Sequence, residues 1–373
     1  MAKRVILAVA GAGKTYHICN SIKQDEKNLI LAYTHANIQN IKNELIKLHG
    51  AIPKLTTVMT FDSFIYRFLL CPYEPTILRF FQQETFISKG ITMRTPPAQT
   101  LKNNSGAPYK NPKYVKKDKL EHYFAENGQY YCSNISELIM TVKENKKSLI
   151  KKAVVGLNSF YDQVMIDEFQ DFREYDYEVV IALAKEMECI LLVGDYHQHS
   201  VSAINNSGKP FKKRKTEVSY EEFKEILKEA KLEVDEETLK ASRRCPREIC
   251  NYVKAKLEIN ISADNNNQGH VIWVKDQYEK ILEDDSITKL IFNNSDKYRF
   301  NAVNWSYSKG DTMKNVCVIL TENFEKLNCD NFVSTKISTS TINKLYVAMT
   351  RTEGNLYLIK SEDFKSIKKK FQL

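Results

Sequence analysis

The chain has 373 residues, enough for two or three domains of ordinary size. Hydrophobic residues make up 43% of it, which excludes a disordered chain and predicts buried cores. Lys and Arg number 55 against 46 Asp and Glu, and the net charge of +9 suits a partner made of phosphates without requiring one. No apolar run approaches the roughly 18 residues of a membrane span, and the 8 cysteines contain no Cys-x-x-Cys pair. We therefore expect a cytoplasmic protein with reduced thiols and no membrane partner.

Residues 8–15 read Ala-Val-Ala-Gly-Ala-Gly-Lys-Thr and follow a short apolar run that predicts a strand. A strand, a glycine-rich loop and a helix form the context of a phosphate-binding loop, because the glycines let main-chain N–H groups surround a β-phosphate. Lys14 would reach the β- and γ-phosphates, and the Thr15 hydroxyl would ligate Mg²⁺. The first glycine of the consensus is Ala8, and the alternative is a plain glycine-rich turn. The residues predicted to bind ATP are Ala10, Gly11, Ala12, Gly13, Lys14 and Thr15.

Apolar strands and amphipathic helices alternate along the first 70 residues. Strands are predicted at 5–7, 28–33 and 56–60, and a helix is expected after each of them. This alternation is typical of an α/β fold with a parallel sheet, in which ligands collect at the carboxyl ends of the strands.

Residues 71–153 differ in composition from the preceding segment and are expected to form a domain inserted into the first sheet. Prolines are unusually frequent there, at positions 72, 75, 96, 97, 108 and 112. Two basic clusters, 113–119 and 143–152, either line a phosphate backbone or form a solvated surface, and the sequence leaves both readings open.

A further strand, predicted at 164–166, ends in Asp-Glu-Phe-Gln-Asp. Downstream of a phosphate loop, two adjacent carboxylates are expected to have different roles. Asp167 would hold Mg²⁺, usually through water, and Glu168 would orient and deprotonate the attacking water. The alternative is a surface Asp–Glu turn.

The strand predicted at 189–193 leads into Gly-Asp-Tyr-His-Gln. Gln198 is uncharged, so it can hydrogen-bond both a γ-phosphate oxygen and a neighbouring group, as a sensor of that phosphate would. Asp195, His197 and His199 lack a fourth partner for a metal site, and we do not expect one there.

The second half predicts another α/β unit without a phosphate loop of its own. The basic segment 209–215 is expected to mark the boundary, followed by a helix at 220–231. A helix carrying Ile249, Tyr252 and Val253 and strands at 270–274, 290–292 and 316–320 are also predicted, with an exposed Asn-rich turn at 264–267.

Five segments in this order resemble the motifs of the UvrD/Rep branch of superfamily 1 helicases. They are residues 10–15, 33–37, 167–171, 193–198 and 345–351, and the last reads Leu-Tyr-Val-Ala-Met-Thr-Arg. Shorter matches lie at 242–244 and 308–310. The resemblance implies an α/β protein with two RecA-like P-loop NTPase domains built on parallel sheets. The first domain would comprise 1–70 and 154–208 with a mixed insert at 71–153, and the second would comprise 209–373 with little or no insert.

The resemblance also assigns roles in ATP hydrolysis. It implies that Arg244 and Arg351 of the second domain reach the γ-phosphate, where an arginine can raise the rate by ~10³–10⁵. The alternative for either is a surface ion pair worth under about 1 kcal/mol, and Arg243 is an adjacent rival for Arg244. The expected catalytic residues are Glu168, Lys14, Gln198, Arg244 and Arg351.

In the family that the chain resembles, single-stranded DNA crosses both domains. The residues at matching positions are Thr34, Asn37, Thr60, Ser63, Phe64, Trp305 and Lys309. Hydroxyls and amides would bind phosphates, and Phe64 and Trp305 are the candidates for stacking on bases. For Phe64 a place in the core is the favoured alternative, whereas the polar neighbours of Trp305 predict partial exposure.

Three departures from the family pattern matter. No Gln-containing segment that reads adenine precedes the phosphate loop, which leaves selectivity for ATP open. Residues 201–203 lack the aromatic-Arg-Gly string that usually stacks on DNA, and Asp311-Thr312 stands where a Glu often contacts ribose.

The function implied by the resemblance is ATP- and Mg²⁺-dependent translocation on single-stranded or partly duplex DNA, 3′ to 5′, as a DNA helicase. The alternative is a regulatory subunit, gated by ATP and DNA, that licenses a partner nuclease without processive unwinding. Compact relatives of this kind occur in phages, mobile elements and antiviral defence, and a role in DNA repair is a further reading.

Overall fold

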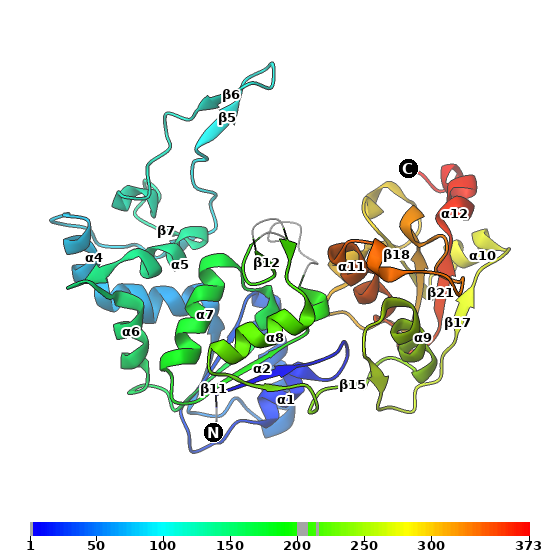
Figure 1. The fold of residues 1–373 in the computed structure, drawn as a ribbon, viewed down its shortest axis with the longest axis horizontal. Coiled ribbons are helices and arrows are strands. Elements are labelled where there is room, and N and C mark those ends of the chain that lie inside the picture. The colour runs from blue at the N-terminus through cyan, green and yellow to red at the C-terminus, as the bar shows by residue number, and fades with distance from the viewer. Residues whose placement is uncertain (1–2, 200–207, 214–215) are drawn as a thin grey trace. The chain divides into compact units, whose positions relative to one another are not determined.

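The computed structural model describes residues 3–199, 208–213 and 216–373 (Figure 1). By its internal contacts the chain divides into two compact units, each of which draws on several segments. Unit 1 comprises Met1–Arg4, Ile18–Leu192 and Glu225–Glu233. Unit 2 comprises Val5–His17, Val193–Lys224 and Val234–Leu373.

A six-stranded sheet contains every strand predicted in the first 200 residues. Its order is β14-β1-β11-β10-β2-β3, and β10, β2 and β3 pair in parallel, with Met165 opposite Ile30 and Ile30 opposite Val58. The strands are β1 (Arg4–Leu7), β2 (Asn28–Ala32), β3 (Thr56–Thr60), β10 (Gln163–Asp167), β11 (Ile190–Gly194) and β14 (Glu233–Asp235). Strand β14 lies after residue 209, where the second domain was predicted to begin. This sheet therefore includes a strand from the segment that was assigned to the second domain. Its three residues are too few and too polar to be recognised from their pattern.

Helix α2 (His35–His49) shows how local sequence sets the ends of an element. The Thr34 hydroxyl caps its first turn by accepting from the N–H of Asn37 at 3.1 Å. Gly50 ends it in the left-handed conformation, at φ +77°. Ile38, Ile41 and Leu45 form its buried face. Helices α1 (Lys14–Asn20), α3 (Phe61–Phe64) and α7 (Glu174–Glu186) also follow predicted or observed strands, and α3 continues as a π-helix over Ile65–Leu70.

The insert is mixed α/β, as predicted. Its helices α5 (Cys132–Thr141) and α6 (Leu149–Leu157) both contact α7, while the hairpin of β5 (Thr100–Lys102) and β6 (Pro108–Lys110) projects from the rest of the insert (Figure 1). Tyr123 is fully buried in the insert, and its hydroxyl donates to the carbonyl of Lys117 at 3.0 Å. The other elements are α4 (Glu74–Phe80), β4 (Ile91–Thr92), β7 (Tyr130–Tyr131), β8 (Lys143–Glu144) and β9 (Lys147–Ser148).

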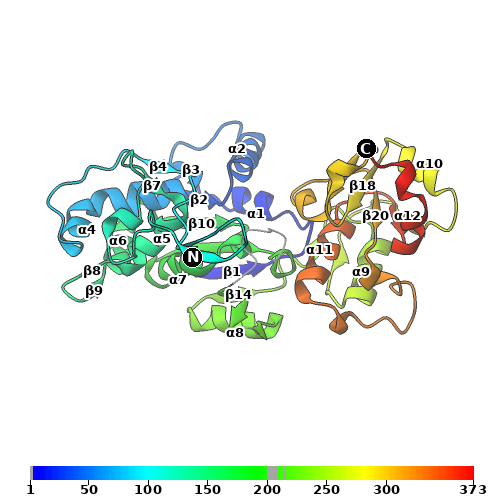
Figure 2. The ribbon, with the colours of Figure 1, turned by 90° about the horizontal axis from the view of Figure 1, so that it is seen from above.

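The second sheet belongs to unit 2, has the order β17-β21-β20-β18-β19, and pairs in parallel throughout. Its neighbouring strands β18 and β20 are labelled in Figure 2. Its strands are β17 (Val271–Trp273), β18 (Ile287–Ile291), β19 (Ala302–Asn304), β20 (Asn315–Ile319) and β21 (Leu356–Ile359). Leu282 of α10 (Tyr278–Glu283) and Phe364 of α12 (Ser361–Ile367) pack into one apolar cluster with Ile287 and Ile319. Helices α9 (Arg247–Leu257) and α11 (Thr339–Met349) contact each other and this sheet. The predicted fold class, two RecA-like units on parallel sheets, is confirmed.

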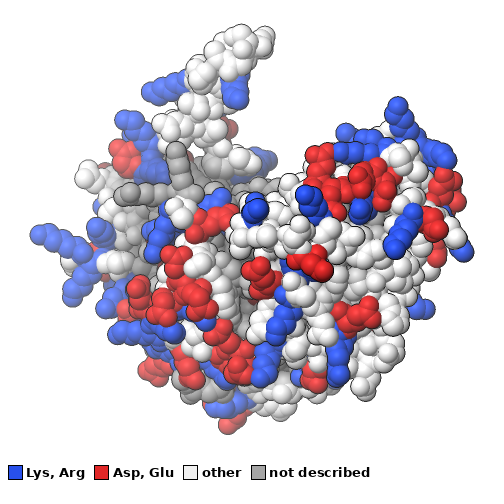
Figure 3. Space-filling model, turned by 45° about the vertical axis from the view of Figure 1, so that its right-hand side comes forward, with Lys and Arg blue, Asp and Glu red and all other residues white. Residues whose placement is uncertain are grey.

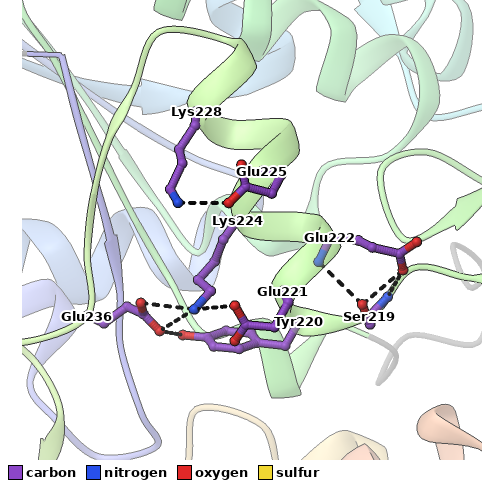
Figure 4. A network of polar contacts seen from close by, with 8 residues as sticks. All are labelled: Ser219, Tyr220, Glu221, Glu222, Lys224, Glu225, Lys228 and Glu236. Carbon is purple, nitrogen blue, oxygen red and sulfur yellow. Dashed lines mark hydrogen bonds and ion pairs between the residues drawn. The ribbon is translucent and has the colours of Figure 1, made fainter.

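Helix α8 (Tyr220–Glu229) begins with a capping box, which explains why the chain becomes helical there (Figure 4). The N–H of Glu222 donates to the Ser219 hydroxyl at 3.3 Å, and the N–H of Ser219 donates to the Glu222 carboxylate at 2.8 Å. Lys224 then pairs with Glu221 at 2.7 Å and with Glu236 at 3.2 Å. Unit 2 also contains two short strand pairs, β12 (Lys212–Lys213) with β13 (Thr216–Glu217) and β15 (Ala241–Ser242) with β16 (Ser262–Ala263).

All eight cysteines are free thiols, as expected. Within the described residues, no helix is both long and apolar enough to cross a bilayer. On the face drawn in Figure 3, Lys and Arg side chains are interspersed with Asp and Glu rather than gathered in one basic surface.

Candidate functional site

The phosphate loop has the backbone that its glycines were expected to provide. Gly11 and Gly13 lie at φ +72° and +85°, in the left-handed region that favours glycine. A Cβ on Gly11 would also lie 2.7 Å from the Ser242 hydroxyl, so that position excludes a side chain for two reasons. Ala8 replaces the first consensus glycine at little cost, because it takes an ordinary φ and its N–H donates to the carbonyl of Gly194 at 2.8 Å.

The side chains that follow this loop fit a nucleoside triphosphate with Mg²⁺. Lys14 begins α1 with only 9% of its surface exposed, and Thr15 beside it is half-buried. A buried ammonium next to two left-handed glycines is suited to a polyphosphate. No group of three or more His, Cys, Asp or Glu that could hold a metal occurs in the described parts of the chain. Mg²⁺ commonly binds through one or two protein oxygens, waters and substrate phosphates, so a site with few protein ligands is compatible with this ion.

Asp167 and Glu168 lie in unit 1, at the carboxyl end of β10. Asp167 is 2% exposed, and its Oδ1 accepts from the N–H of Glu168 at 2.9 Å. Glu168 takes the left-handed conformation, with φ 53°, which is costly for a residue with a side chain. Its carboxylate accepts a hydrogen bond from the side-chain amide of Gln170. Such strain is typical of functional positions, because it fixes the direction of a side chain.

A buried hydrogen-bond chain in unit 2 joins the predicted sensor to the phosphate loop. Gln198 donates through Nε2 to Oδ2 of Asp195 at 2.8 Å, and the Tyr346 hydroxyl donates to the same oxygen at 3.1 Å. The same hydroxyl accepts from the main-chain N–H of Ala10 at 2.7 Å. Gln198 is 3% exposed, and Asp195 and Tyr346 are fully buried. Asp195 also accepts from the N–H of His197 at 3.0 Å, so its carboxylate receives hydrogen bonds from Gln198, Tyr346 and His197.

The two predicted arginines of unit 2 meet at the carboxyl end of α11. Arg244 is half-buried and donates through Nη1 to the carbonyl of Thr350 at 3.2 Å. Arg351 is 1% exposed, and its Nε donates to the carbonyl of Val347 at 2.8 Å. The rival, Arg243, is exposed and lies over the ring of Tyr16, 5.4 Å from its centroid.

The Asn-rich turn is not the simple exposed turn predicted from its composition. Asn265 is half-buried and donates to the carbonyls of Ser242 and Cys245, both at 2.9 Å. Asn267 donates to the carbonyl of Arg244 at 2.8 Å. These two asparagines hold the loop that carries Arg244, a role with no local sequence signal because their partners lie 20 to 23 residues earlier.

The polar DNA candidates of unit 1 stand at the starts of helices. Thr34 is exposed and Asn37 half-buried at the first turn of α2. Thr60 is 8% exposed, and its hydroxyl donates to that of the half-buried Ser63 at 2.8 Å. Phe64 is fully buried, which agrees with its favoured alternative as a core residue and removes it as a stacking candidate.

The expectation that Trp305 is partly exposed is wrong. Its side chain is 0% exposed, and Nε1 donates to the carbonyl of Leu290 at 3.1 Å. The exposed ring of this turn is Tyr307, which is 73% exposed and which sequence reasoning missed. Lys309, two residues on, is half-buried. Residues 201–203, where the family's aromatic-Arg-Gly string is missing, lie outside the described residues.

The two basic clusters of the insert differ in their surroundings. In the second cluster, Lys152 pairs with Glu144 at 2.7 Å and Lys151 with Glu186 at 3.5 Å, which suits a solvated surface. The first cluster lines a groove of about 860 Å³. Its basic and aromatic residues are Tyr109, Lys110, Tyr114, Lys116 and Lys119.

Together, the parallel α/β units and the phosphate loop define a P-loop NTPase. Residues 79–200, about a third of the chain, match the family model of the UvrD/REP helicase N-terminal domain. This stretch of the chain is therefore similar to the helicase family whose motifs the sequence resembles.

No curated protein matches the chain. Among solved structures, the PRRSV helicase aligns at a TM-score of 0.45 with 13% identity over 99% of this chain and 54% of its own. An arterivirus nonstructural protein 10 (helicase) in complex with DNA aligns at 0.45 with 13% identity over 95% and 60%. The chain therefore spans little more than half the length of these helicases.

Proposed function

We propose that the chain is a DNA-stimulated ATPase that moves along single-stranded DNA. The observation that carries the proposal is the buried chain from Ala10 through Tyr346 and Asp195 to Gln198. It ties a phosphate loop to a residue suited to sensing a γ-phosphate, and α11, which supplies Tyr346, ends beside Arg244 and Arg351. A protein that only bound nucleotide would have little need of these connections.

Each residue of the nucleotide site has a chemical task in this proposal. Lys14 would bind the β- and γ-phosphates. Thr15 of unit 2 and Asp167 of unit 1 are each proposed as an oxygen ligand for Mg²⁺, which would neutralise phosphate charge when bound. Glu168 accepts a proton from the attacking water. Gln198 orients that water or a γ-phosphate oxygen, and Arg244 and Arg351 stabilise the charge that develops on the transferred phosphoryl group.

The proposed DNA site uses polar and aromatic groups of each unit separately. Thr34, Asn37, Thr60 and Ser63 of unit 1 bind phosphates through hydroxyl and amide groups. In unit 2, Tyr307 stacks on bases and Lys309 pairs with the backbone. The lysines of the groove in the insert add sequence-independent attraction for the strand.

Purified protein is tested for ATP hydrolysis with and without single-stranded DNA, beside Lys14→Ala. We expect hydrolysis that DNA stimulates and that the substitution removes. Displacement of streptavidin from oligonucleotides biotinylated at either end then reports movement, and we expect release from the 5′ end, which corresponds to 3′-to-5′ travel. DNA-dependent hydrolysis without displacement at either end would instead favour the regulatory subunit that licenses a partner nuclease.

A further inference from the structure

We propose that Tyr346 is a positioning residue that couples the phosphate loop to Gln198 and so lets the protein distinguish a nucleoside triphosphate from a diphosphate. The inference rests on the proposed function for its ligand and concerns a residue to which neither the motif comparison nor the family match gives a role.

The geometry places the Tyr346 hydroxyl between two groups that are far apart in the chain. It accepts from the N–H of Ala10 at 2.7 Å and donates to Oδ2 of Asp195 at 3.1 Å. The sequence separations are 336 and 151 residues, so the fold rather than local structure creates the junction. The tyrosine is fully buried, and water is therefore a poor substitute for either partner.

The junction also fixes the amide of Gln198. Asp195 accepts from Nε2 of Gln198 at 2.8 Å, so the amide presents its donor end to Asp195 and its Oε1 acceptor away from it. An acceptor held in this way can receive a hydrogen bond from a water that attacks the γ-phosphate. Tyr346 thus acts on the reacting atoms only through Asp195 and Gln198.

The hydroxyl stays a donor throughout the physiological pH range. Burial, and then the nearby carboxylate of Asp195, raise the pKa of Tyr346 well above its usual value. The hydrogen bonds from the N–H of Ala10 to Tyr346 and from Tyr346 to the carboxylate of Asp195 therefore do not depend on a change of protonation.

A displacement of the phosphate loop would be passed on by this chain. Ala10 precedes Gly11, whose left-handed conformation shapes the loop, and Tyr346 lies on α11, five residues before Arg351. The proposal requires the Ala10 N–H to lie differently when the loop holds a triphosphate and when it holds a diphosphate, so that Tyr346 transfers that difference to Asp195. Phenylalanine has the same ring and would keep the packing while breaking both hydrogen bonds.

The test compares Tyr346→Phe with Tyr123→Phe, which removes the hydroxyl of another fully buried tyrosine, one that lies in the insert. Full-length proteins are titrated with fluorescent ADP and with a fluorescent, non-hydrolysable ATP analogue, and their Tm values and steady-state rates are measured. We expect Tyr346→Phe to reduce the ratio of the affinity for the ATP analogue to the affinity for ADP at least fivefold. We also expect it to lower kcat about tenfold or more, with a Tm close to that of Tyr123→Phe.

An affinity ratio equal to that of wild type would overturn the proposal, as would an equal change in Tyr123→Phe. The affinity ratio does not require hydrolysis. Wild-type protein that binds both nucleotides without hydrolysing ATP would contradict the proposed function, while the ratio would still decide the role of Tyr346.

Discussion

The main-chain N–H of Arg243 donates to the carbonyl of Gly11 at 2.9 Å. The loop 242–245 therefore lies directly against the phosphate loop within unit 2, close enough that a Cβ on Gly11 would be 2.7 Å from both the Ser242 hydroxyl and the Cβ of Arg244. The loop that carries Arg244, a proposed catalytic residue, is thus in direct contact with the loop that is proposed to bind the phosphates.

Gly11→Ala should abolish detectable nucleotide binding, because it combines a left-handed backbone with a steric clash. The matched control is Gly50→Ala at the end of α2, where φ is +77° and nothing lies within 4 Å of the added Cβ. The control should lose about 1 kcal/mol of stability and keep its nucleotide affinity. Titration with a fluorescent ATP analogue separates the two, and unchanged binding in Gly11→Ala would contradict the assigned loop.

Arg244→Ala should lower kcat by ~10³ or more, because an arginine that stabilises the transferred phosphoryl group contributes about that much. Arg243→Ala keeps the main-chain bond to Gly11 and should change kcat by only about twofold. Steady-state hydrolysis at saturating ATP and DNA measures both. The reverse result, a large loss in Arg243→Ala alone, would give the role to the rival.

Tyr307→Ala should weaken binding to single-stranded DNA by about 1–3 kcal/mol, the usual contribution of one stacked base. It should leave the stability of the protein nearly unchanged, because the ring is 73% exposed. Trp305→Ala should instead lower the free energy of unfolding by about 3–5 kcal/mol, as expected for a large core side chain. Fluorescence anisotropy with labelled oligonucleotides and urea denaturation test the pair, and full DNA affinity in Tyr307→Ala would remove the proposed platform.

These two aromatic residues show how far sequence reasoning extends. The motifs located the phosphate loop and the strands that lead to Asp167 and Gln198, because each depends on short-range patterns. Which ring of the turn that carries Trp305 and Tyr307 is buried depends on a partner 15 residues away, the carbonyl of Leu290 that Trp305 binds. The asparagines that hold the Arg244 loop were missed for the same reason, since their partners are distant in the chain. Strand β14 was missed because its three residues are few and polar.

The contribution of Asp176 to stability should fall as pH rises from about 4 to about 7. Burial, reinforced by the charge of Asp62, raises the pKa of Asp176 from 3.8 to about 7. The folded state therefore keeps a proton that the unfolded state has released, and folding becomes less favourable across this interval by at most about 4 kcal/mol from this residue. Asp176→Asn should flatten the dependence. Urea denaturation at pH 5 and pH 8 tests this, and equal slopes in the two proteins would show that Asp176 titrates normally.

The most direct test of the central claim is ATP hydrolysis by Glu168→Gln and wild type, each with and without single-stranded DNA. Glutamine preserves the size of the side chain and its hydrogen bonding but cannot take a proton from water. We predict strong stimulation of the wild-type rate by DNA, and a loss of hydrolysis in Glu168→Gln with retained binding of ATP. A wild-type rate that ignores DNA, or equal hydrolysis by the two proteins, would contradict the assignment of this chain as a DNA-dependent motor.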